Sequence, residues 1–418
     1  MDKLVVISSG KTLDVSSSVA HEDLEEYSNV LLLADGVAAF NEKMELLPLI
    51  SDFLTHYRMK HSDKSVVTYG KNLCYLVKYL TTYDDEYKNS RRDDCLLTVH
   101  ANSIQQYYLY CRKDEDKEGN TKTPVSARTI ENRDATYASF FGEFLCNPPS
   151  GYKCFRFEEN PYENGGLARV AKKSLIVPAQ FSDVAALIQV AKHEREKCLI
   201  QFMYDSGLRR AEVKDVLQRD ILSLSRQERN SLIVDEQTFC IPSPYSILTV
   251  KGNKGRGREA KYRNTIISNE TINRVQKYNS SIEYKKHKRK WGQTPMPAFL
   301  NSNGNPYTAN AVSKLVTKLS KRACKIGLIN KPISPHKIRH GYGAVVLNSD
   351  DLGDSQLDRL LLLQQCLGHD SLDTTQEYTK IPVEVWDKFA DSKGKELNRH
   401  ELMKKLRDKT RLRQGAIK

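Results

Sequence analysis

The segment SPHKIRHGYG has the residues needed to bind an anion at the start of a helix. Ser334 is a typical N-cap residue and Pro335 suits the first helical position, so we expect a helix to begin here. His336 and Arg339 lie three positions apart and would share one helical face. With the unpaired backbone N–H groups of the first turn, they would attract a phosphate. A solvated basic helix face is the plainer interpretation of this motif taken alone.

The segment YDSGLRRAEVKDV contains a second candidate cation and an acidic residue that could pair with it. Gly207 is expected to end one helix, with Arg209 beginning the next. Glu212 follows three residues later and could hold the Arg209 guanidinium in place. The neighbouring Arg210 is an alternative cation, although the Gly-Leu-Arg spacing favours Arg209. A surface ion pair of little energetic value is the plainer interpretation.

Two further segments carry an amine, an imidazole and a phenol. In ILTVKGNKGRG, Lys251 leaves an apolar strand and enters a Gly-rich hairpin turn, so its ammonium could reach a ligand. In LGHDSLDTTQEYTK, His369 follows a helix expected to end at Gly368, and Tyr378 comes nine positions later. A solvated turn and a surface helix pair are the plainer interpretations.

The composition narrows the classes of protein that could use such groups. The chain has 418 residues and a formal net charge of +13, which favours a polyanionic partner such as nucleic acid. Its nine cysteines include no CxxC pair, so neither a disulfide framework nor a zinc site is expected. No apolar run reaches about 18 residues, and the first apolar run is too short for a secretory signal. We therefore expect a cytoplasmic protein with no membrane span.

Helical periodicity dominates the chain, and the expected fold is mainly α with a small antiparallel β-sheet. A helical domain is predicted over 43–165, with Ser65 as the N-cap of a helix that includes Leu73 and Leu80. A linker over 166–180 leads to a mixed α+β domain over 181–387. Residues 1–42 form an extension of unknown role, and 388–418 form a basic C-terminal tail.

Taken together, these segments resemble the active-site signature of the tyrosine recombinases, the phage-integrase-like family. The resemblance is carried by SGLRRAE, VKGNK, HKIRHGYGA and LGHDSLDTTQEY, and it covers about residues 45–385. KSVVTYGKNLCYLVKYL and SARTIENRDATYASFFGEFL are similar to the family's core-binding, DNA-clamping domain. The 42-residue interval from Arg209 to Lys251 is longer than a minimal three-stranded sheet needs, so Lys254 is an alternative lysine. The first 42 residues have no clear counterpart.

The resemblance implies a catalytic role for each matched residue. Tyr378 would attack a DNA phosphodiester and leave a 3′-phosphotyrosyl link and a free 5′-hydroxyl. Arg209 and Arg339 would clamp the nonbridging oxygens, and His369 would hydrogen-bond the phosphate. His336 would take and later return the phenol proton.

Lys251 would protonate the departing 5′-oxygen. Neither a metal nor another cofactor is implied, because the covalent link conserves the phosphodiester energy.

The implied function is site-specific DNA recombination through a Holliday junction, with a homo-tetramer acting on two double-stranded DNA sites. A role in a mobile element, accessory DNA-bending or directionality factors, nucleoid association and exchange of the tail between subunits would fit this function. A non-catalytic DNA-binding regulator and a type IB topoisomerase-like enzyme are the alternatives. Side chains expected to contact DNA are Lys254, Arg256, Arg133, Lys285, Lys286 and Lys288.

Overall fold

The computed structural model describes residues 3–6, 36–116, 118–147, 156, 158–169, 177–224, 231–234, 237–252, 262–292, 294–369, 375–376 and 397–410. The chain divides into two compact units that meet in the sequence between Lys173 and Ser174. This boundary falls within the stretch 166–180 that the sequence marks as a linker. None of the helices over the described residues is both long and apolar enough to cross a membrane.

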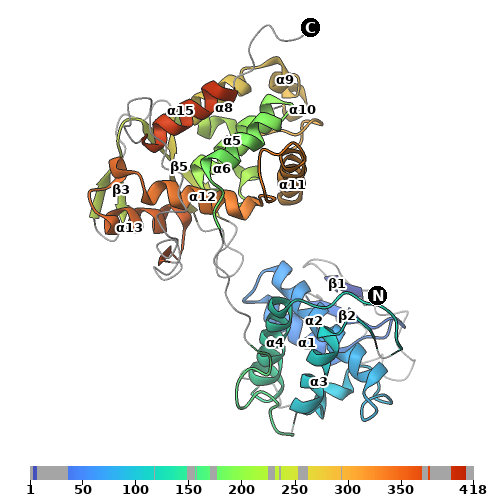
Figure 1. Ribbon diagram of the computed structural model, residues 1–418. Coiled ribbons are helices and arrows are strands. Elements are labelled where there is room, and N and C mark those ends of the chain that lie inside the picture. The colour runs from blue at the N-terminus through green and yellow to red at the C-terminus, as the bar shows by residue number, and fades with distance from the viewer. Residues whose placement is uncertain are drawn as a thin grey trace, which may run out of the picture. The chain divides into compact units, whose positions relative to one another are not determined.

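The N-terminal unit is a helical bundle with one small strand pair (Figure 1). Strand β2 packs against α1, and the Ala39 N–H donates to Ser51 Oγ at 3.0 Å, so part of the segment 1–42 belongs to this unit. Its elements are β1 (Lys3–Val6), β2 (Val37–Phe40), α1 (Pro48–Arg58), α2 (Asp63–Tyr83), η1 (Asp94–Leu97), α3 (Ala101–Arg112), α4 (Ala127–Phe140) and the π-helical turn η2 (Phe141–Leu145).

Aromatic side chains form much of the core of this unit. The Phe53 ring of α1 meets Phe140 and Phe144 edge-on, with ring centroids 5.2 and 5.5 Å apart. The N-cap predicted for α2 is wrong by one turn. The helix begins at Asp63, because the Ser62 side chain accepts the Ser65 N–H at 3.3 Å. Ser65 is therefore the residue whose backbone N–H is capped.

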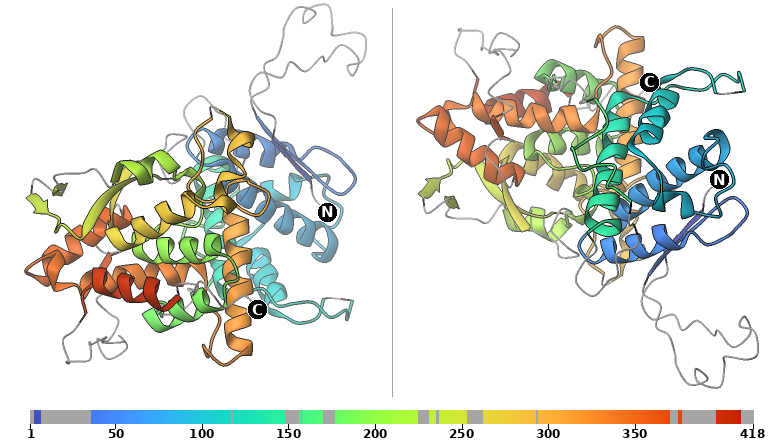
Figure 2. Two further views of the ribbon diagram at one scale, coloured as in Figure 1. Left: turned by 90° about the horizontal axis from the view of Figure 1, so that it is seen from above. Right: turned by 90° about the horizontal axis from the view of Figure 1, so that it is seen from below.

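The C-terminal unit packs helices around a buried central helix, α6, as Figures 1 and 2 show. Helices α5, α8 and α12 and strand β6 all contact α6. Its elements are α5 (Phe181–Val190), α6 (Glu194–Ser206), η3 (Val213–Asp215), α7 (Gln218–Leu224), β3 (Ser231–Val234), β4 (Gln237–Cys240), β5 (Tyr245–Lys251), β6 (Tyr262–Ser268), α8 (Asn269–Asn279), α9 (Ile282–Lys285), α10 (Lys288–Trp291), α11 (Ala309–Lys325), α12 (Pro335–Leu347), η4 (Asp350–Leu352), α13 (Gln356–Leu367) and α15 (Arg399–Thr410).

Within the described residues the strands form three antiparallel pairs, β1–β2, β3–β4 and β5–β6, in an otherwise helical chain, which confirms the predicted fold class. In the β5–β6 pair, Tyr245 lies opposite Ser268 and Lys251 lies opposite Tyr262. Two local predictions are wrong. No α-helix begins at Arg209, where a loop leads into η3.

The second error concerns SNETINRVQKYNSSIEYKKHKRKW (268–291), whose periodicity predicts one helix that ends in a basic cluster. It is divided into α8, α9 and α10. The break occurs at Ser280–Ser281, where the Ser281 hydroxyl accepts the Tyr284 N–H at 3.3 Å and so starts a new helix.

Helix α15 completes the core of the C-terminal unit. It packs against α8 and α5 (Figures 1 and 2). Its Leu402, Met403 and Leu406 side chains are buried in the core of the unit. Arg399 is 1% exposed and donates through Nε to Asp205 at 2.9 Å. The described part of the basic tail is therefore an apolar and ionic anchor within its own chain.

Candidate active site

Two arginines from different segments converge on the end of α13. Arg339 is 5% exposed and donates to the carbonyl oxygens of Gly207 and Leu367, each at 2.6 Å. Arg209 donates through Nη2 to the same Leu367 oxygen at 3.3 Å and to the Gly368 oxygen at 3.4 Å. The two guanidiniums therefore lie side by side at one carbonyl oxygen.

The helix that carries Arg339 begins as its sequence predicts. The Ser334 hydroxyl accepts the Lys337 N–H at 3.3 Å, and Pro335 occupies the first helical turn. His336 is exposed and Arg339 is buried, so the histidine stands at the edge of the site and the guanidinium inside it.

Glu212 positions Arg209 from a fully buried location. Its carboxylate accepts the Arg209 backbone N–H at 2.7 Å and the Nη1 N–H at 3.0 Å. It also accepts from Nη2 of Arg263 on β6 at 2.7 Å. Burial alone would raise the pKa of Glu212, but the charges and hydrogen bonds of Arg263 and Arg209 lower it below its ordinary value. Glu212 is thus a charged bridge between two arginines.

Helices α6 and α13 each end at a glycine whose carbonyl oxygen accepts a hydrogen bond from one of the two arginines. Gly207 closes α6 with a φ of +61°, and Gly368 closes α13 with a φ of +60°. A Cβ at Gly207 would lie 2.4 Å from the Tyr342 ring, and a Cβ at Gly368 would lie 2.6 Å from Arg263 Cδ. Both positions therefore need glycine for conformation and for space, and both carbonyl oxygens serve the arginines.

His369 follows Gly368 and lies among these cations. Its Nδ1 is 3.0 Å from Thr375 Oγ1. Burial lowers the pKa of His369 to about 4, and the nearby charges of Arg339 and Arg209 act in the same direction. The imidazole is therefore neutral at physiological pH.

His336 contacts a second histidine that the sequence interpretation passed over. The Nε2 atoms of His336 and His340 are 3.0 Å apart. Burial lowers the pKa of His340 to about 4, helped by the charges of His336 and Arg339. The spacing HKIRH already places these rings one helical turn apart, so the contact could have been found from the sequence.

Arg263 is the other residue that the sequence interpretation missed. It is buried on β6 and donates to the Cys366 carbonyl oxygen as well as to Glu212. Its contacts are more than 50 positions away in the chain, so no local spacing indicates them.

The structure describes only some of the other residues that were predicted for the site. Lys251 is exposed at the end of β5. Tyr378, Lys254 and Arg256 lie outside the described residues. Arg210 donates to Ser313 Oγ on α11 at 2.6 Å, so it does not share the Leu367 oxygen with Arg339 in the way Arg209 does.

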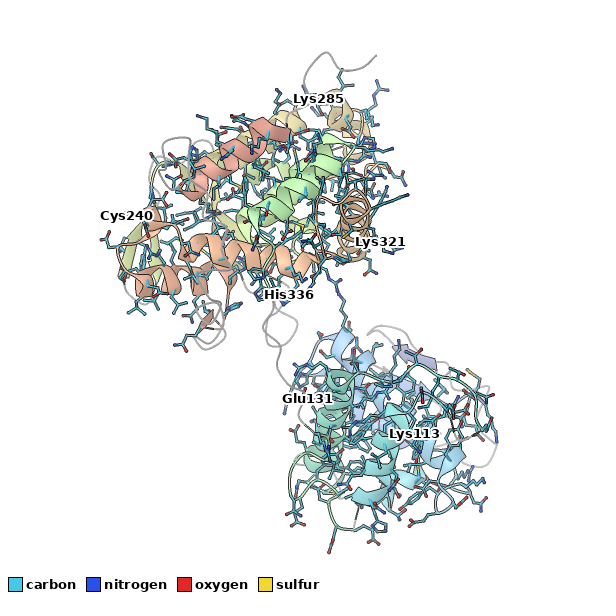
Figure 3. All side chains as sticks on the ribbon, in the orientation of Figure 1. Lys113, Glu131, Cys240, Lys285, Lys321 and His336 are labelled. Carbon is cyan, nitrogen blue, oxygen red and sulfur yellow. The ribbon has the colours of Figure 1, made fainter. Side chains whose placement is uncertain are left out.

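The predicted DNA-contact residues occupy different surroundings. Arg133 is half-buried in the N-terminal unit, where it donates to the Tyr107 hydroxyl at 2.6 Å and covers the Tyr75 ring at 4.7 Å. Lys285, Lys286 and Lys288 are exposed on and beside α9 and α10. In Figure 3, Lys285 and His336 lie on opposite sides of the C-terminal unit.

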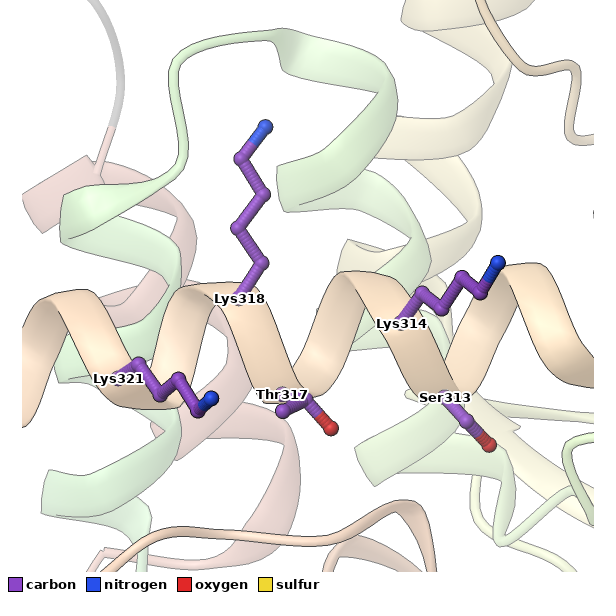
Figure 4. Close-up of a pocket in the computed structure, with 5 residues that line it drawn as sticks. All are labelled: Ser313, Lys314, Thr317, Lys318 and Lys321. Carbon is purple, nitrogen blue, oxygen red and sulfur yellow. The ribbon is translucent and has the colours of Figure 1, made fainter.

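A further basic surface is a row of three lysines on α11. Lys314, Lys318 and Lys321 are exposed and, with Ser313 and Thr317, line a shallow depression along this helix (Figure 4). Helix α11 packs beside α12, and its Ser313 accepts the Arg210 hydrogen bond. The row is therefore linked to the segments that carry Arg209 and Arg339.

Comparison with known proteins identifies the family. The sequence profile of the Phage integrase family matches residues 180–384. The chain is 26% identical over 355 residues to tyrosine recombinase XerC of Pediococcus pentosaceus, covering 82% of this chain and 95% of that protein. It is 24% identical over 347 residues to tyrosine recombinase XerD of Listeria innocua, covering 80% and 94%.

A solved structure agrees in fold. The XerH site-specific recombinase, in a post-cleavage complex with a palindromic difH substrate, superposes with a TM-score of 0.51 at 16% identity and with 77% of each chain covered. The matched range 180–384 includes Arg209, Arg339 and His369. The chain belongs to the phage integrase family of tyrosine recombinases.

Proposed function

We propose that this site-specific tyrosine recombinase cleaves and rejoins double-stranded DNA through a 3′-phosphotyrosyl link at Tyr378. The observation that carries the proposal is the shared Leu367 carbonyl oxygen, which holds the Arg209 and Arg339 guanidiniums beside each other. Two adjacent guanidiniums match the nonbridging oxygens of one phosphate, where negative charge grows as the nucleophile attacks.

Hydrogen bonds from the surrounding residues orient the two guanidiniums. The Gly207 and Leu367 oxygens fix the plane of Arg339, and Glu212 fixes Arg209 through its backbone and its side chain. The groups are therefore oriented before DNA binds, which reduces the reorganisation required in the transition state.

His369 completes the phosphate site as a neutral donor. The Thr375 hydroxyl can donate to Nδ1, which leaves the proton of the neutral ring on Nε2. Nε2–H would then donate to a phosphate oxygen. This assignment follows from the lowered pKa of His369, because a neutral imidazole carries one N–H.

The remaining groups would move protons. A phenol is a weak nucleophile because its reference pKa is about 10. His336 would take the proton of Tyr378, and Lys251 would protonate the 5′-oxygen, with Lys254 as the alternative acid. The phosphotyrosyl bond stores the energy for rejoining.

The basic surfaces would hold the DNA backbone. The chain's net charge of +13 and the lysine row of α11 favour phosphate contacts beside the site. The predicted contacts at Lys254, Arg256, Arg133, Lys285, Lys286 and Lys288 would add to them. The helical domain 43–165 would clamp the duplex together with the catalytic domain 181–387.

At the level of the assembly, a homo-tetramer would pair two sites and pass through a Holliday junction, with accessory DNA-bending or directionality factors setting the outcome. In the tetramer, the tail 388–418 would link subunits by placing α15 on a partner's core, in the position that it occupies here on its own chain. The protein would act on nucleoid DNA in the cytoplasm.

A nicked suicide duplex tests the proposal against a DNA-binding regulator. The duplex carries a site recovered from the repeats that flank the gene, and the nick lets the cleaved fragment escape. The proposal predicts a covalent protein–DNA adduct with the native chain and none with Tyr378→Phe at equal DNA binding. Binding by both chains without any adduct would support the regulator.

A further inference from the structure

The residue after Arg339 has a role that the family signature does not give it. We propose that His340 is a positioning residue that accepts a hydrogen bond from His336 and stabilises the imidazolium formed when His336 takes the Tyr378 proton. This inference rests on the proposed role of His336 as the base in the cleavage step.

The geometry of the two rings carries the inference. They lie one turn apart on α12, with their Nε2 atoms 3.0 Å from each other. Their centroids are 4.3 Å apart and their planes meet at 81°. His336 is exposed, whereas His340 is half-buried. A contact of this length between two ring nitrogens requires one N–H between them.

The direction of this hydrogen bond follows from where charge can reside. A positive charge on His340 would be unfavourable, because Arg339 precedes it on α12. It would also repel a positive charge on His369, since His340 is one of the groups that lower the pKa of His369. Burial and the charges of His336 and Arg339 lower the pKa of His340 to about 4, so it is neutral at physiological pH and can offer a lone pair. Arg209 and Arg263 act on His369 in the same direction.

A protonated His336 permits one arrangement only. Its two ring nitrogens then both carry hydrogen, so Nε2–H must face an acceptor, and His340 Nε2 is that acceptor. In the neutral state the same bond keeps the His336 proton on Nε2 and leaves Nδ1 as the base. This is the role that a carboxylate plays behind a catalytic histidine in hydrolases, performed here by an imidazole.

The proton balance of the cleavage step is then complete. The Tyr378 O–H proton moves to His336 Nδ1 while the phenol oxygen forms its bond to phosphorus. The phosphorus–O5′ bond breaks, and the 5′-oxygen takes a proton from the lysine acid. On rejoining, the 5′-hydroxyl attacks phosphorus and gives its proton back to the lysine, while the phosphorus–phenol bond breaks and the His336 proton returns to the Tyr378 oxygen.

The test compares His340→Phe, which keeps a ring but removes the acceptor, with His340→Gln, which keeps an acceptor oxygen. The rate of adduct formation on the nicked duplex is measured from about pH 5.5 to about pH 9. Because the base must be neutral, the rate rises with pH through the pKa of His336. Loss of the acceptor destabilises the imidazolium, so His340→Phe should move this midpoint down by about one pH unit or more and lower the rate about tenfold.

The glutamine variant should keep the midpoint near that of the native chain. In a His336→Ala background, adding His340→Phe should change the residual rate by less than about twofold. Thermal unfolding and duplex binding of each variant verify that it is folded. An unchanged midpoint in folded His340→Phe, or a further large loss in the His336→Ala background, overturns the inference. A native chain that forms no adduct overturns the proposed function instead.

Discussion

Arg209 and Arg339 donate to the same carbonyl oxygen, that of Leu367, at 3.3 and 2.6 Å. This shared acceptor brings the loop after α6 and the first turns of α12 to the end of α13. Glu212 and Arg263 add an ionic layer beneath Arg209, with both side chains buried. The proposed phosphate clamp is therefore held in place by backbone oxygens and one carboxylate, and its two guanidiniums are oriented in the absence of DNA.

Replacing Arg209 by lysine should reveal whether the fork geometry matters. Lysine keeps the charge but cannot hold both the Glu212 and the Leu367 contacts, so we expect the adduct rate to fall by about 10²-fold or more. Arg210→Lys is the matched control, because Arg210 contacts Ser313 and its replacement should lower the rate by less than about threefold. Equal losses in the two variants would show that the neighbouring arginine has been assigned to the wrong role.

Neutralising Glu212 should weaken both the fold and the reaction. Glu212→Gln leaves Arg209 and Arg263 without their buried anion, which is expected to cost about 3 kcal/mol or more. The lowered pKa of Glu212 means that its contribution is present above the unfolded pKa of about 4.3 and is lost as the pH falls through the folded value. Urea unfolding at pH 7 measures the cost, and an unfolding free energy equal to that of the native chain would contradict the bridge.

The buried histidines predict a loss of stability in mild acid. The pKa values of His340 and His369 lie at about 4 in the folded chain, below the unfolded value of about 6.5. The unfolded chain therefore binds more protons between these values, and the free energy of unfolding should fall as the pH drops from about 6.5 to about 4.

Chemical unfolding at several pH values checks this dependence. A His340→Gln, His369→Gln double variant should show a flatter profile, because the two titrating rings are gone. Profiles of equal slope in the native and double-variant chains would place the acid sensitivity elsewhere.

The anchor of α15 should be essential for stability. Arg399 is buried beside Asp205 and lies 4.8 Å from the Tyr342 ring, so Arg399→Ala leaves a buried carboxylate without its partner. We expect a loss of about 3–5 kcal/mol in the unfolding free energy. Lys404→Ala, on the exposed face of the same helix, should change it by less than about 0.5 kcal/mol. Similar melting temperatures for the two variants would show that α15 is not held in this position.

The lysine row of α11 should set the salt dependence of DNA binding. Changing Lys314, Lys318 and Lys321 to alanine should lower the slope of log K against log salt by up to about 0.9 for each phosphate that the protein no longer neutralises. The control changes Lys285, Lys286 and Lys288, which lie on and beside the helices α9 and α10 and are also predicted to contact phosphate, and we expect it to lower the slope less. A larger change in the control would place the DNA on the side of Lys285 in Figure 3.

Local sequence chemistry was enough to predict several parts of the site. Gly207 and Gly368 end their helices, Ser334 caps α12, and Glu212 contacts Arg209 three residues away, because each of these depends on a few neighbouring residues. The prediction of Ser65 as the N-cap of α2 failed because serine also occupies position 62, and it is Ser62 that caps the helix.

Long-range contacts were beyond such reasoning. Arg263 reaches Glu212 and the end of α13 only because β6 packs beside them, and no spacing in the sequence records that packing. The role of the Leu367 carbonyl oxygen could not be predicted either, since every residue has a backbone oxygen and the sequence does not show which one the arginines contact. The anchoring of α15 by Arg399 likewise required the fold, because Asp205 lies far away in the chain.

The structure of the Tyr378→Phe chain bound to an intact duplex that carries its recombination site would show whether the two arginines bind one phosphate. We predict that the guanidiniums of Arg209 and Arg339 lie within about 3 Å of the nonbridging oxygens of one phosphate. His369 should donate to the same phosphate, and the phenyl ring introduced at position 378 should face it. A complex in which the two guanidiniums contact different phosphates, or in which no phosphate reaches them, would contradict the account.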